Sequence, residues 1–419
     1  MGIKDTVKAI IPNTLKYRIK RGLNQYYNRS MLKRYHQLSE GKQMHYPMGI
    51  NLIGDIKAET GLGQSMRILA KILDENQIPF VVLQMNQPGN LARNQGDWDH
   101  KISEKAQYAI NIIHINNSEW AESYLQFPED VLLGRYNIAY WLWELEQLPK
   151  QWLPCIETID EIWAPSEFIC ACYRQYTDKP VIKIPYSIHL KTPVEFDRMH
   201  FDLPEDVFLF LIMYDFKSIS ERKNPKGMVD AFCKAFAPEE ANANKIGLIV
   251  KINHVESKQE LNTLKEELQE YKHVYYITDN LSRKEVEALI ASADVLVSLH
   301  RSEGFGLPLA EAMYLGTPVI ATNWSATTEF MTDETACLVD YKMVLLDKQL
   351  GPYPAGSRWA EADISQAVKY MQQLYQDSAY YEQIKSAASY AIRDNLNYHL
   401  VGKLISSRLQ EIHEFDKII

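Results

Sequence analysis

Short apolar runs alternate with amphipathic segments over most of this 419-residue chain. A short continuous apolar run is typical of a parallel strand buried on both faces, whereas apolar residues spaced three to four apart indicate a helix. The first group of predicted strands covers residues 48–54, 80–83, 109–115, 136–145, 160–164 and 181–185. The second group covers residues 207–213, 246–252, 274–277, 295–299, 318–322 and 336–339. Two successive sets of strand–helix units predict an α/β protein with two parallel sheets.

The same pattern divides the chain into consecutive parts, and the length is sufficient for two α/β domains. We expect a basic N-terminal arm at residues 1–45, an N-terminal domain at 46–188, a polar hinge at 189–204, a C-terminal domain at 205–372 and final helices at 373–419. The boundaries follow from the places where the strand–helix alternation stops and restarts.

The composition is that of a soluble globular protein, with 46% hydrophobic and 24% charged residues. No apolar run reaches the roughly 18–20 residues of a membrane-spanning helix, and we expect no secretory leader. The five cysteines are scattered and odd in number, which favours reduced thiols in a cytoplasm over a disulfide framework. No cluster of Cys and His has the spacing of a metal site.

Charge is distributed unevenly between the arm and the rest of the chain. Residues 1–45 have a net charge of +8, so the remainder carries −17 to give the total of −9, which argues against general nucleic-acid binding. Apolar residues recur in the arm at roughly helical spacing, interrupted by Pro12: Val7, Ile10, Ile11, Leu15, Ile19 and Leu23. Two interpretations are open. The arm forms a helix on an anionic membrane surface, where each basic residue contributes about 1 kcal/mol, or it packs on the body or stays mobile.

The strongest chemical signal follows the apolar run at residues 295–299. Residues 300–313 read HRSEGFGLPLAEAM, which predicts a glycine-containing loop leading into a helix with Pro308 in its first turn. Gly304 and Gly306 let the backbone pass close to a ligand. The free N–H groups of the loop and the helix start point beyond the carboxyl end of the strand, a usual ligand position in open α/β sheets.

Two glutamates flank this loop at a spacing of eight residues, Glu303 on the loop and Glu311 within the early helix. A carboxylate only accepts hydrogen bonds and can take two hydroxyl protons, which suits a ligand with adjacent hydroxyls such as a sugar or a ribose. The stretch EGFGLPLAEAM and its E-x7-E spacing resemble the retaining glycosyltransferases of the two-domain GT-B fold, closest to family 4. The resemblance is strong over residues 205–340 and moderate over 48–188.

The resemblance implies a fold, a reaction and roles for these residues. Two Rossmann-like domains would face each other across a cleft, and the final helices would cross back to the N-terminal domain. Glu303 and the backbone N–H groups of Gly304, Phe305 and Gly306 would hold the donor sugar, and Glu311 would take the ribose hydroxyls. Members of the family transfer with retention at the anomeric carbon and without a metal.

A basic loop after the first strand of the C-terminal domain carries the next candidates. Relatives place an arginine and a lysine here to hold the donor diphosphate, and we assign Arg222 and Lys226 to this role, with Lys223 as a near substitute. Such cations beside a helix N-terminus would stabilise the charge that develops on the leaving diphosphate; the alternative is a cationic surface loop. Relatives hold the nucleobase by backbone groups of a loop like residues 278–281, where we assign Asn280.

The first strand of the N-terminal domain leads into a second glycine-containing loop. Gly61 and Gly63 resemble a mononucleotide-binding opening, but Met66 stands at the third glycine position of a dinucleotide fingerprint. The loop is similar to the family's loop that faces the donor phosphates and the acceptor, which implies donor contacts for Gly61, Gly63 and Arg67. A tight strand-to-helix turn is the alternative.

Two later strands of the N-terminal domain end in candidate residues. His114 and Asn116 stand where many relatives carry H-x-H, with the second histidine near the donor sugar, so either side chain could face the cleft. We assign His114 to the catalytic site, and a core histidine satisfied by the backbone is the alternative. Glu144 and Trp143 end an aromatic strand and are assigned to the acceptor, with core packing as the alternative.

Residues and resemblance together predict a retaining glycosyltransferase that moves a hexose from a nucleotide-diphosphate sugar to a hydroxyl of a glycan or lipid-linked acceptor, in cell-surface polysaccharide synthesis. We expect no cofactor and no metal, because the D-x-D of Asp97 and Asp99 lies in a polar loop. The expected location is the cytoplasm, or the inner face of the membrane if the arm binds there.

Two alternatives to this function stay open. One is a nucleotide-sugar epimerase on the same fold, and the other is a catalytically silent partner subunit, expected to have lost Glu303, Glu311 or the cationic pair.

Overall fold

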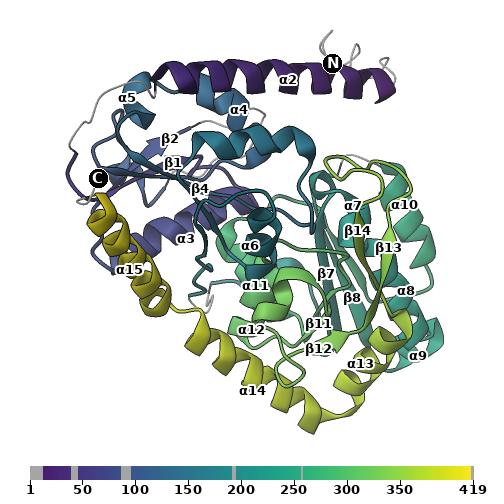
Figure 1. Ribbon diagram of the computed structural model, residues 1–419. Helices are drawn as coiled ribbons and strands as arrows, with labels where there is room; N and C mark the ends of the chain where they lie inside the picture. The colour runs from purple at the N-terminus through teal and green to yellow at the C-terminus, as the bar shows by residue number, and fades with distance from the viewer. Residues whose placement is uncertain (1–12, 39–45, 86–95, 191–194, 256–257, 417–419) are drawn as a thin grey trace.

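The computed structural model describes residues 13–38, 46–85, 96–190, 195–255 and 258–416. Two parallel six-stranded sheets, each packed with helices, stand side by side in Figure 1. The predicted α/β architecture with two parallel sheets is therefore confirmed.

The sheet of the N-terminal domain has the strand order β2-β1-β3-β4-β5-β6, and all of its paired strands are parallel. Its strands are β1 (Ile50–Gly54), β2 (Phe80–Gln84), β3 (Ile110–Ile113), β4 (Tyr136–Tyr140), β5 (Glu161–Ala164) and β6 (Val181–Lys183). The order reverses between β1 and β3. The loops that leave their carboxyl ends diverge at this point and leave a crevice between them.

The sheet of the C-terminal domain has the order β12-β11-β10-β7-β8-β9 and is also parallel throughout. Its strands are β7 (Phe208–Asp215), β8 (Ile246–Asn253), β9 (Val274–Ile277), β10 (Val295–Ser298), β11 (Val319–Thr322) and β12 (Cys337–Val339). This is the doubly wound order of a dinucleotide-binding fold, and it reverses between β7 and β10. The loops of residues 216–224 and 299–306 therefore meet at one crevice.

Helices connect the strands and cover the sheets. They are α2 (Asn13–Leu38), α3 (Gly61–Glu75), α4 (Asn117–Gln126), α5 (Glu129–Leu132), α6 (Glu167–Arg174), α7 (Ser220–Lys223), α8 (Pro225–Ala235), α9 (Pro238–Ala243), α10 (Lys258–Glu267), α11 (Arg283–Ser292), α12 (Leu307–Leu315), α13 (Ile364–Gln376), α14 (Ser378–Asn395) and α15 (Tyr398–Asp416). Short 3-10 segments are η1 (Asp99–Lys101), η2 (Lys150–Thr158), η3 (Met199–Phe201), η4 (Phe216–Ser218) and η5 (Ser325–Glu329).

The strands are apolar runs because helices cover both of their faces. Strand β8 is buried over its first seven residues, and only Asn253 at its end is partly exposed. Helix α3 follows the amphipathic prediction, with Thr60 accepting a hydrogen bond from the backbone N–H of Gly63 at its start. Burying these faces removes apolar surface from water and is the main force that holds each domain together.

The basic arm is helical over residues 13–38, and the second half of this helix, α2, packs on the N-terminal domain. Met31 is fully buried there, and Arg34 donates hydrogen bonds to the carbonyls of Leu125 and Phe127 at 2.9 and 2.6 Å. Leu23, Tyr26, Arg29 and Lys33 remain exposed. The predicted apolar positions at residues 7, 10 and 11 lie outside the described residues.

A two-stranded hairpin lies at the edge of the C-terminal domain. The glycines and prolines of residues 350–363 are typical of an irregular loop, but β14 (Arg358–Ala362) pairs antiparallel with β13 (Tyr341–Leu345). The hairpin lies beside α7 in Figure 1. Its Tyr353 and Trp359 are buried in the same apolar cluster as Trp143 of the N-terminal domain. The glycines and prolines before it hid the strand, which pairs with β13 along its whole length and packs Trp359 into this cluster.

The final helices run along the outside of the molecule, and α15 packs against α3 of the N-terminal domain (Figure 1). Arg408 of α15 forms an ion pair with Glu161, with 2.6 Å between its Nη2 and the Oε2 of Glu161. Glu161 on β5 is fully buried and also accepts hydrogen bonds from Trp163 and Tyr136. The end of the chain is thus tied to the N-terminal sheet.

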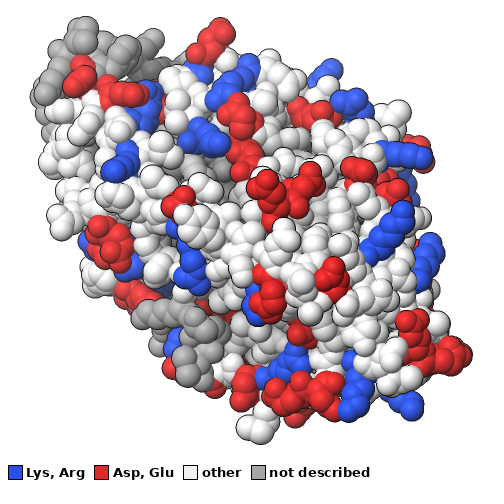
Figure 2. Space-filling model, turned by 90° about the horizontal axis from the view of Figure 1, so that it is seen from below, with Lys and Arg blue, Asp and Glu red and all other residues white. Residues whose placement is uncertain are grey.

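Lys and Arg side chains are interspersed with Asp and Glu on the face shown in Figure 2. Among the described residues of that face, no continuous basic surface of the kind that binds nucleic acid is visible. Within the same described ranges, none of the helices combines the length and apolar character required to cross a membrane. All five cysteines are free thiols.

Candidate active site

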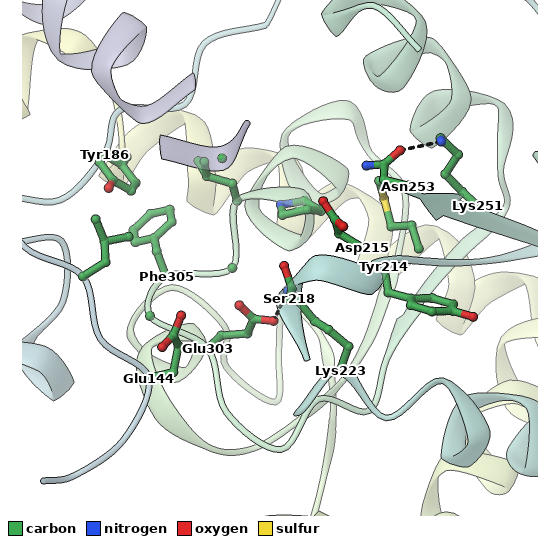
Figure 3. Close-up of a pocket in the computed structure, with 17 residues that line it drawn as sticks. Glu144, Tyr186, Tyr214, Asp215, Ser218, Lys223, Lys251, Asn253, Glu303 and Phe305 are labelled. Atoms are coloured by element: carbon green, nitrogen blue, oxygen red, sulfur yellow. Dashed lines mark hydrogen bonds and ion pairs between the residues drawn. The ribbon is translucent and has the colours of Figure 1, made fainter. Parts of the chain in front are cut away.

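The crevices of the two sheets face one another across a cavity of about 260 Å³ (Figure 3). The C-terminal domain supplies most of its wall, from the loops that follow β7 and β10 and from the end of β8. The N-terminal domain contributes Gly61, the first residue of α3 after the loop that follows β1, together with Leu142, Glu144 and Tyr186. The reversal of strand order in each sheet therefore places the two glycine-containing loops of the sequence on opposite sides of one site.

Glu303 is the centre of the charged part of this cavity. Its side chain is about 10% exposed, its Oε2 lies 3.1 Å from Nη1 of Arg222, and its Oε1 pairs with Nζ of Lys223. Burial alone would raise the pKa of this carboxyl, but Lys223 and Arg222, helped by His300, lower it from 4.5 to about 2. Glu303 is therefore ionised at neutral pH and is a weak base.

The two cations reach Glu303 because of an unusual local backbone. Helix α7 is one turn long and lies between Ile219 and Asn224, whose φ angles are +60° and +56°. Asn224 also accepts a hydrogen bond from the N–H of Gly227 and so starts α8. Left-handed backbone at non-glycine residues carries strain and is concentrated at functional sites. The turn presents Arg222 and Lys223 together to Glu303.

Lys226, which the sequence assigned to the diphosphate, is not brought to the cavity. Its side chain is 74% exposed and pairs with Asp230 at 2.9 Å and with Glu267 at 3.7 Å on the outside of the domain. The reason is the left-handed residue Asn224, which turns the chain so that Lys226 lies on the outer face of α8. Lys223, the predicted near substitute, lines the cavity instead.

Lys251 is a site residue that the assignments from sequence missed. It is the third residue from the end of β8. Its side chain is buried, with 1% of the residue exposed, and it lines the cavity together with Asn253. Its Nζ donates to the side-chain oxygen of Asn253 at 2.6 Å and to the carbonyl of Asp279 at 2.9 Å. Burial lowers the pKa of Lys251 to about 8. The signal was present in the sequence, because a lysine near the end of a buried apolar strand needs a polar partner.

Helix α12 begins at the glycine loop, as predicted, and Gly306 caps it with a φ of +88°. A Cβ at Gly306 would lie 2.6 Å from a methyl carbon of Thr327, so only glycine fits. Gly304, Phe305 and Gly306 all line the cavity. The glycine loop therefore forms one wall of the cavity.

Glu311 lies in α12 but does not line this cavity. It is 1% exposed, and its carboxylate pairs with Nη2 of Arg283 at the start of α11. Arg283 also contacts Glu287 at 2.9 Å. The two glutamates of the E-x7-E pattern thus contact different cations. Asn280, three residues before Arg283, is exposed and also lies outside the cavity lining.

On the N-terminal side, the glycine loop divides into a ligand-facing and a structural part. Gly61 lines the cavity, and a Cβ there would meet open space. A Cβ at Gly63 would lie 2.0 Å from the carbonyl oxygen of Ala58, so this glycine permits the tight turn. Arg67 donates to the carbonyls of Ile56 and Ala58 at 2.8 and 3.0 Å and holds the loop in place.

His114 lies in the core in the structure, but its Nδ1 has no hydrogen-bond partner among the described residues, so it is not the backbone-satisfied histidine of the alternative. It is 1% exposed, stacks on Tyr140 with ring centroids 5.1 Å apart, and its Nε2 lies 2.9 Å from Oγ of Ser65. Burial lowers its pKa to about 4, so the ring is neutral at pH 7. His114 directly follows β3 with its side chain buried, and Asn116 lines a second cavity instead.

The second cavity has a volume of about 340 Å³ and adjoins the first. Leu142, Glu144 and Ser218 line both cavities. Trp143 lines the second one, although it is only 2% exposed and packs edge-on against Trp152. The assigned acceptor residues Glu144 and Trp143 therefore lie at the junction and on the wall of this second cavity.

Among the residues that the structure describes, no group of three or more His, Cys, Asp or Glu side chains is arranged to hold a metal ion. Asp97 and Asp99 of the D-x-D are exposed, and Asp99 pairs with Lys57 at 2.8 Å.

Comparison with known proteins finds a glycosyltransferase family match in the second half of the chain. Residues 201–345 match the family model described as Glycosyl transferases group 1. A 64-residue segment is 38% identical to an MMP alpha-(1->4)-mannosyltransferase of Mycolicibacterium hassiacum. This segment covers 15% of the present chain and spans only 16% of that curated relative.

Similar solved structures cover nearly the whole chain. Sucrose-phosphate synthase of Thermosynechococcus elongatus superimposes with a TM-score of 0.63 at 16% identity, covering 88% of this chain and 100% of that one. HepE of Anabaena, solved with UDP and glucose, superimposes with a TM-score of 0.60 at 13% identity and covers 87% of this chain and 100% of its own. A glycosyltransferase of Rickettsia africae superimposes with a TM-score of 0.57 at 13% identity and covers 88% of this chain and 99% of its own. The protein has the GT-B fold of these structures.

Proposed function

We propose that the protein is a retaining glycosyltransferase, which moves a hexose from a nucleotide-diphosphate sugar to a hydroxyl of a glycan or lipid-linked acceptor. The observation that carries this proposal is the position of Glu303. The carboxylate lies between Arg222 and Lys223, on a glycine loop, in a cavity between two GT-B domains. The group 1 match includes all of these residues, and HepE binds UDP and glucose on the same fold.

In this proposal Glu303 binds the donor sugar and does not remove a proton. A carboxyl with a pKa of about 2 is a poor general base at pH 7, but it is a strong acceptor for sugar hydroxyls. The N–H groups at Phe305 and Gly306, beside the start of α12, would add hydrogen bonds to the donor.

Lys223 and Lys251 would hold the donor diphosphate, whereas Arg222, which the sequence assigned to this role, lines the second cavity and pairs with Glu303. Both lysines are among the residues that line the cavity, and β7 and β8, which lead to them, are neighbouring strands. As the glycosidic C–O bond breaks, the leaving diphosphate gains negative charge, and fixed cations in a partly buried site stabilise that charge. This supports a metal-independent reaction. We further propose that the leaving phosphate oxygen takes the acceptor proton on the same face, so that the configuration is retained.

Glu311 retains its proposed role at the donor ribose, with one addition from the structure. Its carboxylate is held by Arg283, so a ribose would have to share it with this guanidinium. Asn280 and the neighbouring backbone of the loop between β9 and α11 would lie beyond the ribose, at the nucleobase. Each of these roles extends the donor site from β10 toward β9.

We also propose that helix α2 brings the enzyme to an anionic membrane surface, as expected for synthesis of cell-surface polysaccharide on a lipid-linked acceptor. Support comes from the exposed side chains of Leu23, Tyr26, Arg29 and Lys33, which combine apolar and basic character on one helix. Binding of the full chain to vesicles with and without phosphatidylserine tests this part. Equal binding to both kinds of vesicle would contradict it.

The reaction is tested by NMR of nucleotide sugars incubated with the protein. Glycosyltransferases slowly hydrolyse their donor, so we expect release of nucleotide diphosphate and, from an α-linked donor, α-hexose before mutarotation. The β-anomer as first product would contradict retention, and a new nucleotide sugar would identify an epimerase. Turnover of no nucleotide sugar by correctly folded protein would contradict the proposed function.

A further inference from the structure

We infer that the second cavity is a binding site for a neutral saccharide unit of the acceptor, completed by the hairpin β13–β14. The inference rests on the proposed function, because an acceptor subsite has meaning only beside a donor site. It adds a pocket and a ligand class. It also adds Tyr353, which belongs to a segment beyond the group 1 match that ends at residue 345.

The lining of this cavity is of two kinds. Trp143, Trp152 and Tyr353 provide aromatic surface, whereas Asn116, Ser118 and Glu144 provide hydrogen-bonding groups. Ligand pockets combine mostly apolar walls with a few placed polar groups. A hexose ring has apolar C–H faces and hydroxyl edges, and it fits a wall that is divided in this way.

Charge in the cavity argues for a neutral ligand. Its lining contains one cation, Arg222, and one carboxylate, Glu144. Nη2 of Arg222 lies 4.0 Å from Oε1 of Glu144. These opposite charges offset one another, so the cavity offers no excess charge for a phosphate or a carboxylate group. Hydroxyl groups can donate to the carboxylate and accept from the guanidinium.

Arg222 also has an unmet hydrogen-bonding group. The residue is 5% exposed, and its Nε has no hydrogen-bond partner among the described residues. Its Nη1 is already occupied by the carbonyl of Ser302 and by Glu303. A buried donor without a partner is costly, so the guanidinium of this lining residue has hydrogen-bonding capacity that the described residues leave unused.

The junction between the cavities gives the site its orientation. Glu144 lines both of them and accepts a hydrogen bond from the hydroxyl of Tyr353 at 3.3 Å. Arg222 lies between Glu144 and Glu303, within ion-pair distance of each. A saccharide hydroxyl held by Glu144 would therefore face the cavity that contains Glu303 and the proposed donor sugar. Tyr353 would position Glu144 for this contact.

The test is saturation-transfer NMR with methyl α-glucoside, methyl α-mannoside and methyl β-galactoside, recorded with UDP, GDP and ADP present. We expect ring-proton signals from at least one glycoside with the wild-type protein. Ser118→Leu fills the mouth of the cavity from an exposed helix position and should weaken saccharide binding at least about tenfold. Gln126→Leu, at the exposed far end of the same helix α4, is the matched control and should bind normally.

Tyr353→Phe keeps the ring and removes the hydroxyl that bonds Glu144, so saccharide binding should weaken roughly threefold to tenfold while nucleotide binding is unchanged. No signal from any glycoside, or signals equal in wild type and Ser118→Leu, would overturn the inference even if a nucleotide binds. Saccharide binding that depends on Ser118 without binding of any nucleotide would leave the pocket standing and refute the donor site.

Discussion

Replacing Glu303 by glutamine tests the electrostatic account of the site. The pKa of this carboxyl is lowered from 4.5 to about 2, since Lys223 and Arg222 outweigh the effect of burial. A lowered pKa means that the carboxylate stabilises the fold above pH 4.5 and that this stabilisation is lost as the pH falls toward 2. With these values the wild type should lose about 2 kcal/mol of unfolding free energy at pH 3 through this group alone.

The assay is urea unfolding at pH 7 and pH 3 for wild type, Glu303→Gln and the control Glu266→Gln, which removes an exposed carboxylate of α10. Glu303→Gln should be less stable at pH 7 by about 3 kcal/mol, because two cations remain without their buried partner. It should also lose about 2 kcal/mol less than wild type between pH 7 and pH 3. Equal losses in wild type and Glu303→Gln would refute the lowered pKa of Glu303.

Three further predictions address other parts of the molecule. Arg408→Met should destabilise the fold by about 3–5 kcal/mol in urea unfolding, because the buried carboxylate of Glu161 loses its cation, and Arg408→Met/Glu161→Gln should recover part of this loss. Because the pKa of Lys251 is about 8, this lysine loses its charge between pH 7.5 and 9.5. The affinity for the nucleoside diphosphate, measured by calorimetry, should therefore fall about tenfold over this range, and much less in Lys251→Met. Lys223→Ala should weaken nucleotide binding at least about tenfold, whereas exposed Lys226→Ala should change it less than about twofold; the reverse order would favour the original assignment of Lys226.

The fold could be predicted to a large extent from the sequence because apolar runs are a local signal. Each of the two parallel sheets contains the predicted strands, although several are shorter. The aromatic run at residues 136–145, for example, forms a strand only to Tyr140. Beyond that point its aromatic rings pack in a cluster built from both domains, and no local pattern records such packing.

Parts of the site depended on backbone conformation and tertiary contacts that the sequence does not show. The loop of Glu303 was found from its glycines, but the choice between Lys223 and Lys226 is decided by the left-handed turn at Asn224. His114 looked like a residue at ligand height, yet its side chain is buried in the core just after β3. Tyr353 could not be connected with Glu144, which is 209 positions away in the chain and meets it only across the cleft.

The most direct test of the donor site is a thermal-shift screen with UDP-, GDP-, ADP- and dTDP-sugars, with and without EDTA, on wild type and Glu311→Ala. A nucleotide sugar at about a hundred times its Kd should stabilise the fold by about 2.7 kcal/mol. The account predicts that one nucleotide class raises the melting temperature, that EDTA does not change the shift, and that Glu311→Ala loses it. If no nucleotide sugar shifts the melting temperature of folded wild-type protein, the glycosyltransferase proposal is contradicted.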